Sequence, residues 1–254
     1  MAGPAQPITL VTGASSGIGA ALAKRLARRG DHVILVARRL RLLQEVAAEI
    51  TATGGSSEIA VCDVTVGEAA RNCVAEALRK HSRIDRLILN AGGGSRTPPE
   101  QLTGADMRAS FDLNLFGVVN FVEAALPSLL AQGKGQIVAI GSLAGFRGLP
   151  HAASYGAAKA ALMNYIESLR IDLAPRGIAV TLAAPGFVVT KDSKKQRAKP
   201  MSIDVERAAD LLAKAILAQR PYVSFPWRLA WIARLTRMLP PSLYDRLIRA
   251  LDRR

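Results

Sequence analysis

The sequence predicts a doubly wound α/β fold, in which helices cover both faces of a parallel β-sheet. Two observations support this class. Hydrophobic residues make up 50% of the 254 residues, which suits one large core. Short apolar, β-branched runs also alternate with helical stretches of ten or more residues, which is typical of strands joined by crossover helices. Connection and handedness rules leave the doubly wound sheet as the leading topology.

The alternation continues in order along the chain. The apolar runs predict strands at Ile8 to Thr12, His32 to Ala37, Glu58 to Cys62, Ile84 to Asn90, Gln136 to Ile140 and Ala179 to Ala183. The stretches between them predict helices at Ala20 to Arg29, Leu40 to Ala52, Glu68 to His81, Leu113 to Leu130 and Ser154 to Leu173. We therefore expect one domain over residues 1–225, followed by a basic, amphipathic helical extension over residues 226–254.

A glycine-rich turn follows the first predicted strand. Thr12-Gly13-Ala14-Ser15-Ser16-Gly17-Ile18-Gly19 lies between that strand and the first predicted helix. Glycine permits a sharp turn and the close approach of a phosphate, and a helix N-terminus attracts negative charge. A purely structural turn is the alternative. The strand–turn–helix context favours a loop that binds the pyrophosphate of a dinucleotide.

Two arginines stand where the second predicted strand ends. Many dinucleotide-binding folds place an acidic residue there to bind the ribose diol, whereas this chain has Ala37-Arg38-Arg39. An acidic side chain repels a 2′-phosphate, and a guanidinium can pair with it in forked geometry. Arg38 and Arg39 therefore predict NADPH in preference to NADH. The alternative is that both are solvated residues at the start of a helix.

A tyrosine, a lysine and a serine form a candidate catalytic set. Tyr155 and Lys159 are four residues apart on a predicted helix, so they project from one face. A tyrosine with an ordinary pKa of about 10 is a poor base at neutral pH, and a nearby ammonium favours its phenolate. Ser142 follows a predicted strand, where open α/β sheets bind ligands, and its hydroxyl can donate to a substrate oxygen. We expect Tyr155 to act as a general acid/base.

The order and spacing of these motifs resemble the short-chain dehydrogenase/reductase family, whose fold is of the Rossmann type. The resemblance rests on the Thr-Gly-x-x-x-Gly-Ile-Gly loop, on Asn90-Ala91-Gly92 and on Ser142 with Tyr155-x-x-x-Lys159. It extends from about Ile8 to Thr190 and implies further roles. Asp63-Val64 would contact the adenine, and Asn114 would hold a water that links Lys159 to solvent.

The predicted site therefore has two parts. The predicted catalytic residues are Asn114, Ser142, Tyr155 and Lys159. The predicted cofactor-binding residues are Gly13, Ser15, Ser16, Gly17, Ile18, Gly19, Arg38, Arg39, Asp63, Val64, Asn90, Ala91, Gly92, Tyr155, Lys159, Pro185, Gly186, Val188 and Thr190.

No metal site is predicted, because the three histidines, His32, His81 and His151, are scattered along the sequence. Each is interpreted as a surface or packing residue. Cys62 and Cys73 match no zinc or redox spacing, so we expect two free thiols. The chain shows no secretory signal and no run of about 18 uncharged apolar residues. These features predict a cytoplasmic protein.

The net charge of +14 is concentrated near the C-terminus. Lys191 to Lys199 holds five basic residues and one acid, and Pro226 to Arg254 holds seven arginines and two aspartates. Neither segment contains a nucleic-acid-binding module, so no nucleic-acid partner is expected. A nucleic-acid-binding role would rest on net charge alone.

The final segment predicts two amphipathic helices separated by Pro240-Pro241. The apolar half of the first consists of Leu229, Trp231, Ile232, Leu235, Met238 and Leu239. Arg234 and Arg237 fall on the opposite side of the helical wheel. Such helices can cover the substrate pocket, form a subunit contact or lie on an anionic membrane surface, where the protein would then be peripheral.

We thus predict an NADP-dependent oxidoreductase that interconverts a ketone or aldehyde and an alcohol. A homodimer or homotetramer is expected. The sequence does not fix the substrate, although the apolar tail favours a hydrophobic one. The alternative is a catalytically idle dinucleotide-binding protein that senses redox state or acts as a scaffold. The complete Ser142, Tyr155 and Lys159 set argues against that alternative.

Overall fold

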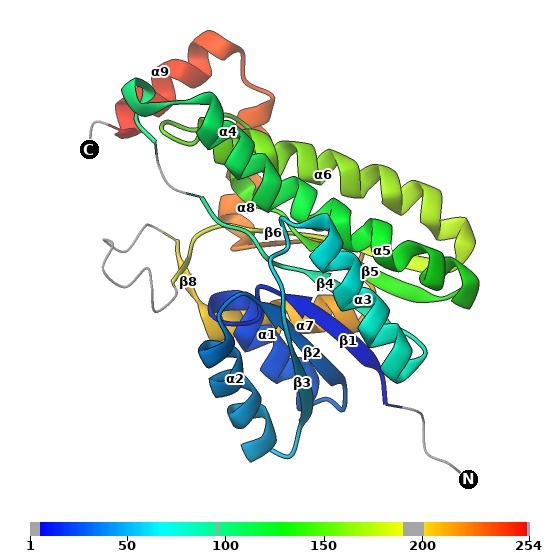
Figure 1. Cartoon of the computed structure of the whole chain (residues 1–254). Coiled ribbons are helices and arrows are strands. Elements are labelled where there is room, and N and C mark those ends of the chain that lie inside the picture. Colours follow the sequence, from blue (N-terminus) through cyan, green and yellow to red (C-terminus); the bar gives the residue numbers. More distant parts are fainter. Residues whose placement is uncertain (1–5, 95–96, 190–200, 253–254) are drawn as a thin grey trace.

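The computed structural model describes residues 6–94, 97–189 and 201–252. In this part of the chain, seven parallel strands form one sheet in the order β3-β2-β1-β4-β5-β6-β9 (Figure 1). The strands are β1 (Ile8–Thr12), β2 (His32–Ala37), β3 (Ser56–Val61), β4 (Arg86–Leu89), β5 (Gly135–Ile140), β6 (Ile178–Pro185) and β9 (Tyr222–Phe225). The chain moves outward from β1 to β3 and then returns to place β4 on the other side of β1. This reversal creates the crevice where doubly wound sheets bind ligands.

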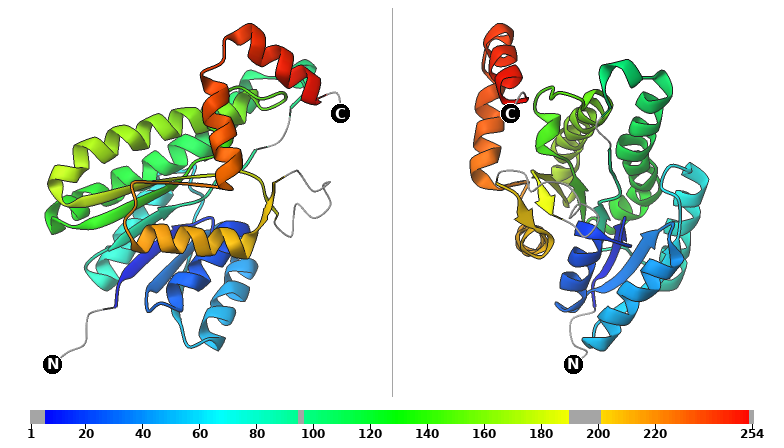
Figure 2. Two further views of the ribbon diagram at one scale, coloured as in Figure 1. Left: turned by 180° about the vertical axis from the view of Figure 1, so that it is seen from behind. Right: turned by 90° about the vertical axis from the view of Figure 1, so that its left-hand side faces the viewer.

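Helices cover both faces of the sheet, so the predicted fold class is confirmed (Figure 2). One face is covered by α1 (Gly17–Ala27), α2 (Leu40–Ala52) and α7 (Val205–Leu217). The other is covered by α3 (Gly67–His81), α5 (Gly117–Gln132) and α6 (Ala153–Leu173), with α4 (Gly104–Phe111) beside α6. Each face has its own buried apolar cluster, because the apolar stripes of its helices pack on strands that are buried on both sides.

The structure contains elements that the sequence analysis did not name. They are α4, α7, β9 and the short parallel pair β7 (Val188–Val189) and β8 (Ile203–Asp204). Asp204 caps α7 by accepting a hydrogen bond from the Arg207 N–H at 2.7 Å. Arg25 of α1 fixes α7 through ion pairs of 2.6 Å to Asp210 and 2.9 Å to Glu206. These contacts hold α7 against α1. Because α7 leads from β8 to β9, they also help to position β9, the seventh strand of the sheet.

The helical stretch from residue 104 to residue 132 contains an 18-residue window with a mean hydropathy of 1.5, so by length and composition it could span a membrane. Its position gives a different explanation. Phe121, Val122 and Leu129 of this stretch are buried in the cluster between the helices and the sheet. One side of this stretch therefore packs against the core of the fold, and 39% of the apolar window is buried.

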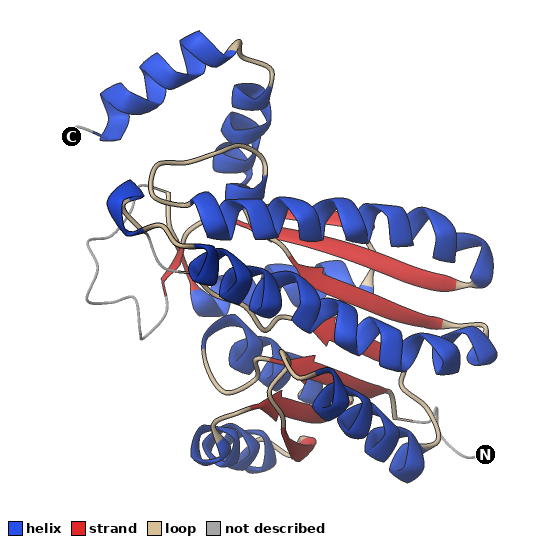
Figure 3. Ribbon diagram, turned by 45° about the horizontal axis from the view of Figure 1, so that its top comes forward, coloured by secondary structure: helices blue, strands red, loops and turns tan. Residues whose placement is uncertain are grey.

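The C-terminal helices α8 (Trp227–Arg237) and α9 (Pro241–Asp252) extend from the end of β9 (Figure 3). The packed side of α8 carries its smaller residues: Ala230 is buried against Leu143 and Ala184, with Leu229 and Ala233 beside them. The large residues Trp227, Trp231, Ile232, Leu235 and Met238 are exposed. The apolar half predicted from the sequence is therefore divided, since Leu229 packs on the domain and most of its larger members face solvent.

Arg147 attaches the junction of these two helices to the domain. Its guanidinium donates to the carbonyl oxygens of Thr236 and Leu239 and lies 3.9 Å from the centre of the Tyr244 ring. The Tyr244 hydroxyl in turn donates to the carbonyl oxygen of Gly148. The loop after β5 therefore holds the end of α8 and the start of α9.

Two of the three histidines are not scattered in space, so that part of the sequence interpretation is wrong. The rings of His32 and His81 have centroids 4.9 Å apart, and His81 also contacts Glu58. Residues 49 positions apart meet here because α3 returns its last turn to the start of β2. Cys62 is buried and Cys73 half-buried, and both are free thiols.

Candidate active site

The glycine-rich loop joins β1 to α1 at the carboxyl end of the sheet. Gly13 has a φ of +68° and Gly17 a φ of +57°, a region that favours glycine. A Cβ on Gly13 would lie 2.8 Å from Asn90 Nδ2, and a Cβ on Gly19 would lie 2.3 Å from the Gly13 carbonyl oxygen. The loop can therefore fold this tightly over Asn90 only because these positions lack side chains. The result is a cradle at the N-terminus of α1 that suits a phosphate.

Asn90 and Ala91 lock this loop to the end of β4. The backbone N–H groups of both residues donate to Thr12 Oγ1 at 3.0 Å, and Asn90 Nδ2 donates to the Thr12 carbonyl oxygen at 3.0 Å. Thr12 thus accepts three hydrogen bonds from one turn. The Asn90 side chain therefore holds the glycine loop in place. Asn90 also lines the cleft, together with the residues that follow it.

The two arginines after β2 have different surroundings. Arg39 donates to Ser15 Oγ at 2.9 Å and to Ser16 Oγ at 2.7 Å, so it lies against the glycine loop. Arg38 is 71% exposed, and its Nη1 lies 3.4 Å from Asp63 Oδ2. Burial works to raise the pKa of Asp63, but hydrogen bonds from Thr65 and the nearby Arg38 guanidinium lower it overall. Arg38 therefore stays close to the mouth of the cleft and open to a ligand.

Lys159 is buried at the carboxyl end of β5, with 3% of its surface exposed. Its Nζ donates to the Ile140 carbonyl oxygen at 2.8 Å and lies 6.0 Å from the centre of the Tyr155 ring. Burial lowers the pKa of Lys159 to about 8, since the charged form loses hydration. Such a perturbed lysine in a cleft is typical of a functional site.

Tyr155 and Ser142 face each other across the cleft. Burial raises the pKa of Tyr155, and a hydrogen bond with the Ser142 side chain partly offsets this increase. Ser142 Oγ also accepts from the Ala144 N–H at 3.1 Å, which orients the hydroxyl at the end of β5. The two hydroxyl groups therefore lie where one substrate oxygen could contact both.

Asn114 is fully buried in a widened, π-helical turn over Asp112–Phe116. Its Nδ2 donates to the carbonyl oxygens of Gly93 at 2.8 Å and Ser110 at 3.0 Å, and its Oδ1 accepts from the Gly93 N–H at 3.1 Å. π-Helical turns often occur at functional sites. Here the extra residue of the turn presents Asn114 to the loop after β4.

These elements surround one cleft of about 440 Å³. The predicted residues that line it are Gly13, Ser15, Ser16, Gly17, Ile18, Arg38, Arg39, Asp63, Val64, Asn90, Ala91, Gly92, Ser142, Tyr155, Lys159, Pro185, Gly186 and Val188. Gly19 and Asn114 support the lining from behind, and Thr190 lies outside the described residues.

Several residues of the cleft are not among those predicted from the sequence. The lining also includes Ala37, Cys62, Gly93, Leu113, Ile140 and Gly141. Gly94 matters too, because a Cβ there would lie 2.5 Å from Tyr155 Cδ2. Three consecutive glycines after Ala91 were the available signal for a close backbone approach at this point. Apolar lining residues such as Leu113 carry no such signal.

A phosphate cradle at the switch point, next to a serine, a tyrosine and a buried lysine, defines a dinucleotide-dependent oxidoreductase. The sequence profile of the short chain dehydrogenases matches residues 7–201. The chain therefore belongs to the short-chain dehydrogenase/reductase family, whose members act on CH–OH groups with NAD(P).

Three relatives illustrate this membership. An uncharacterized oxidoreductase of Myxococcus xanthus is 38% identical over 243 residues, which cover 95% of this chain and 96% of the relative. The crystal structure of a short-chain dehydrogenase from Streptomyces avermitilis superposes with a TM-score of 0.83 at 28% identity, over 96% of each chain. A 3-oxoacyl (acyl-carrier-protein) reductase from Agrobacterium tumefaciens with NADP bound has a TM-score of 0.78 at 30% identity, over 86% of this chain and 92% of that one.

Proposed function

We propose that this protein uses NADPH to reduce a ketone or aldehyde to an alcohol, and runs in reverse on a secondary alcohol. The observation that carries the proposal is the convergence of Ser142, Tyr155 and Lys159 at the cleft that the glycine loop closes. The cradle fits a dinucleotide, because Gly13 and Gly19 let the loop pack tightly on Asn90 and present its backbone at the N-terminus of α1. When bound, the nicotinamide supplies the hydride.

The side chains of the chain itself move the proton. The Tyr155 hydroxyl donates its proton to the substrate oxygen, and the Ser142 hydroxyl donates a hydrogen bond to the same oxygen as negative charge develops there. The Lys159 ammonium stabilises the phenolate that Tyr155 becomes. Its hydrogen bond to the Ile140 carbonyl oxygen, at 2.8 Å, keeps it beneath the cleft.

Asn114 acts on the neighbouring loop. Two of its three hydrogen bonds fix Gly93 beside the cleft. A Cβ on Gly92 would lie 2.9 Å from Asn114 Oδ1 and 3.1 Å from Lys159 Nζ. Asn114 and Lys159 therefore approach the same point of the loop. We propose that Asn114 holds a water at this point and thereby passes the proton of Lys159 toward solvent.

The preference for NADPH follows from Arg38 and Arg39. Arg39 lies against Ser15 and Ser16 of the cradle, and Arg38 is exposed at the mouth of the cleft. The two guanidinium groups bracket the place where the second strand ends and a 2′-phosphate would be bound. Asp63 is the nearest acid to Arg38, and at 3.4 Å their contact is weak enough for a phosphate to replace it.

The substrate is expected to be hydrophobic. The side of the cleft beyond Ser142 continues into an apolar cluster of Leu143, Phe146 and Leu229. A Cβ on Gly186 would lie 2.8 Å from Leu229 Cδ2, so α8 packs directly behind the cleft wall. A ketone on an apolar skeleton would bury its carbon atoms against this wall.

We also propose that α8 attaches the protein to an anionic membrane surface. Trp227, Trp231 and Leu235 are 65%, 56% and 58% exposed, and Arg228 and Arg237 are exposed on the same helix. Aromatic and apolar residues with flanking arginines suit the headgroup region of a bilayer. The competing arrangement places a second copy of the chain on this face, in the homodimer or homotetramer predicted above.

A panel of ketones, aldehydes and alcohols, offered with NADPH or NADH, tests the proposed function. Turnover is followed by the change in reduced-cofactor absorbance, and cofactor binding is measured separately by calorimetry. Reduction of at least one ketone or aldehyde by the NADPH form supports the proposal. Tight NADPH binding without turnover of any compound would instead favour the catalytically idle sensor or scaffold.

A further inference from the structure

Two histidines and a glutamate meet at the amino end of the sheet, opposite the catalytic cleft. His32 begins β2, Glu58 lies on β3 and His81 ends α3. The parallel register pairs His32 with Ser56 and Ile34 with Glu58. The side chains of His32 and Glu58 therefore point to the same face of the sheet, because side chains alternate along a strand. That face is the one that α3 covers.

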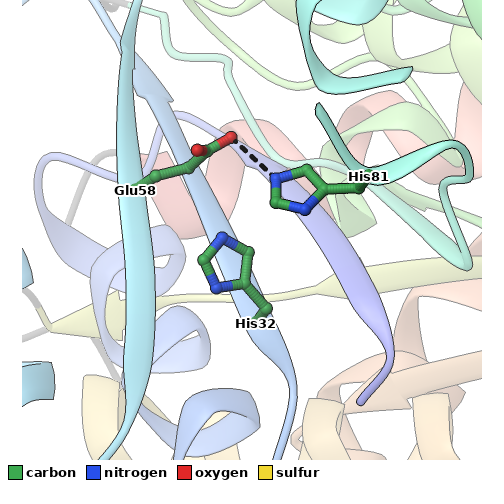
Figure 4. A group of neighbouring side chains, drawn as sticks. All are labelled: His32, Glu58 and His81. Carbon is green, nitrogen blue, oxygen red and sulfur yellow. Dashed lines mark hydrogen bonds and ion pairs between the residues drawn. The ribbon is translucent and has the colours of Figure 1, made fainter. Parts of the chain in front are cut away.

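The donor atoms of the three residues are close together. One donor atom from each lies within 4.8 Å of the other two, and His81 Nε2 lies 3.2 Å from Glu58 Oε1. Figure 4 shows the two rings and the carboxylate directed toward a common point. Donors around a tetrahedral Zn²⁺ with bonds of 2.0–2.1 Å are about 3.3 Å apart. One pair already has this spacing, and small side-chain rotations bring in the third donor.

The His32 ring has the orientation of a metal ligand. Its Nδ1 lies 2.6 Å from Ser56 Oγ, and its Nε2 is buried without a hydrogen-bond partner in the described part of the chain. Histidine ligands typically donate their second N–H to a fixed acceptor, which orients the ring. When Nδ1 carries the proton, it donates a hydrogen bond to Ser56 Oγ, and Nε2 has a free lone pair for a metal ion.

Glu58 divides its two oxygens between different partners. Oε2 lies 3.4 Å from Lys80 Nζ, and Oε1 faces His81. The side chains of His81 and Glu58 are 20% and 24% exposed, so the cluster is shielded yet reachable from solvent. A carboxylate that is oriented by a cation through one oxygen can bind an ion through the other.

We propose that His32 Nε2, His81 Nε2 and Glu58 Oε1 bind one divalent transition-metal ion, of which Zn²⁺ is the best fit. Two imidazoles and a carboxylate form an established zinc donor set, and water completes the tetrahedron. The ion links β2, β3 and α3 at the end of the sheet farthest from the cleft. It therefore stabilises the fold, and the site is independent of the proposed redox function.

Calorimetric titration of the untagged chain, stripped with a chelator and then given ZnCl₂, tests this site. One ion is expected to bind per chain and to raise the Tm by about 5–10 °C at a free zinc concentration of about a hundred times Kd. His81→Gln and Glu58→Gln each weaken zinc binding by at least about tenfold. Both substitutions nearly preserve the side-chain volume. They therefore test the site without a substitution at His32, which is partly buried at the start of β2 and whose replacement could prevent folding.

Two control variants change metal-binding side chains that lie outside the proposed donor set. His151→Gln removes the remaining histidine, and Cys73→Ala removes the thiol on α3. Both are expected to keep the zinc affinity of the unmodified chain. Bound Co²⁺ should show the visible absorption of a tetrahedral ion without a thiolate charge-transfer band. Zinc affinity that is absent, that survives both His81→Gln and Glu58→Gln, or that disappears with Cys73→Ala would overturn the proposal.

Discussion

The catalytic end of the sheet and the C-terminal helices place polar and apolar side chains in opposite ways. At the catalytic end, Asn114 and Lys159 are buried, and each forms hydrogen bonds with the backbone. On α8, Trp231 is 56% exposed, and Met238, which follows the last residue of this helix, is 82% exposed. Burial of polar groups and exposure of large apolar groups both carry a free-energy cost. Each is therefore typical of a place where the protein binds a ligand or another surface. This contrast supports the chemistry proposed for the first region and the membrane attachment proposed for the second.

The two regions share one boundary. Leu229, on the packed side of α8, lies behind Gly186 of the cleft wall. The exposed side of the same helix, with Trp227 and Trp231, faces away from that wall. Changes on the packed side should therefore reach the active site, and changes on the exposed side should not.

Tyr155→Phe should lower turnover by about 10²–10⁴-fold, because the proton donor is removed while the ring and its packing remain. NADPH affinity and Tm should stay near those of the unmodified chain. Steady-state kinetics, calorimetry and thermal unfolding measure the three quantities. Tyr165→Phe is the matched control, since it removes a half-buried hydroxyl from the same helix without touching the cleft. Unchanged turnover in Tyr155→Phe would exclude Tyr155 as the proton donor.

Arg38→Asp should remove or reverse a preference for NADPH over NADH that we expect to be about tenfold to hundredfold. A charge-assisted hydrogen bond to a phosphate contributes about 1.5–3 kcal/mol, which corresponds to that range. The measurement is the Kd of each cofactor. Arg41→Asp is the control, because Arg41 is 80% exposed on the next turn and pairs with Glu45. Equal Kd values for the two cofactors in the unmodified chain would contradict the assignment.

Six of the seven strands and the strand ends around the cleft could be predicted from the sequence, because they depend on local patterns. Four strands that end in short motifs are enough to place Gly13, Asn90, Ser142 and Pro185 at one edge. The pattern of α7 was also present, with the cap at Asp204 and apolar residues on one face, but it was not recognised. Strand β9 is four residues long and offers little periodicity.

Other features depend on contacts that no local pattern encodes. The π-helical turn that presents Asn114 arises from a one-residue shift in hydrogen bonding within an otherwise regular apolar helix. The meeting of His32 with His81 depends on where α3 ends relative to β2. The division of α8 into a packed and an exposed side depends on which of its residues contact Leu143 and Ala184. Hydrophobic patterning alone assigns all apolar residues of that helix to one face.

The pH dependence of the reduction rate should reflect the lowered pKa of the buried Lys159 side chain. Its pKa is lowered from 10.5 to about 8, so its ammonium is present below pH 8 and is lost above it. Since the ammonium stabilises the Tyr155 phenolate, kcat/KM for reduction should fall about tenfold per pH unit above that value. The pKa of Tyr155 is itself raised, so its own ionisation does not produce this limb. Lys159→Ala should be slow at every pH and lack the limb; the same limb in that variant would assign it to another group.

The smallest effect is expected on the exposed side of α8. Trp231→Ser should weaken binding to vesicles that contain anionic lipid by about tenfold, because a buried large apolar side chain contributes about 1.5 kcal/mol or more. Turnover and Tm should not change, since Trp231 is 56% exposed and lies outside the cleft. Ile171→Ser is the control, because Ile171 is 65% exposed on α6, away from the tail. Co-sedimentation should also decrease at high salt, which screens the arginines. If the unmodified chain ignores these vesicles and Trp231→Ser instead splits an oligomer in light scattering, a second copy of the chain covers this face and the membrane proposal is wrong.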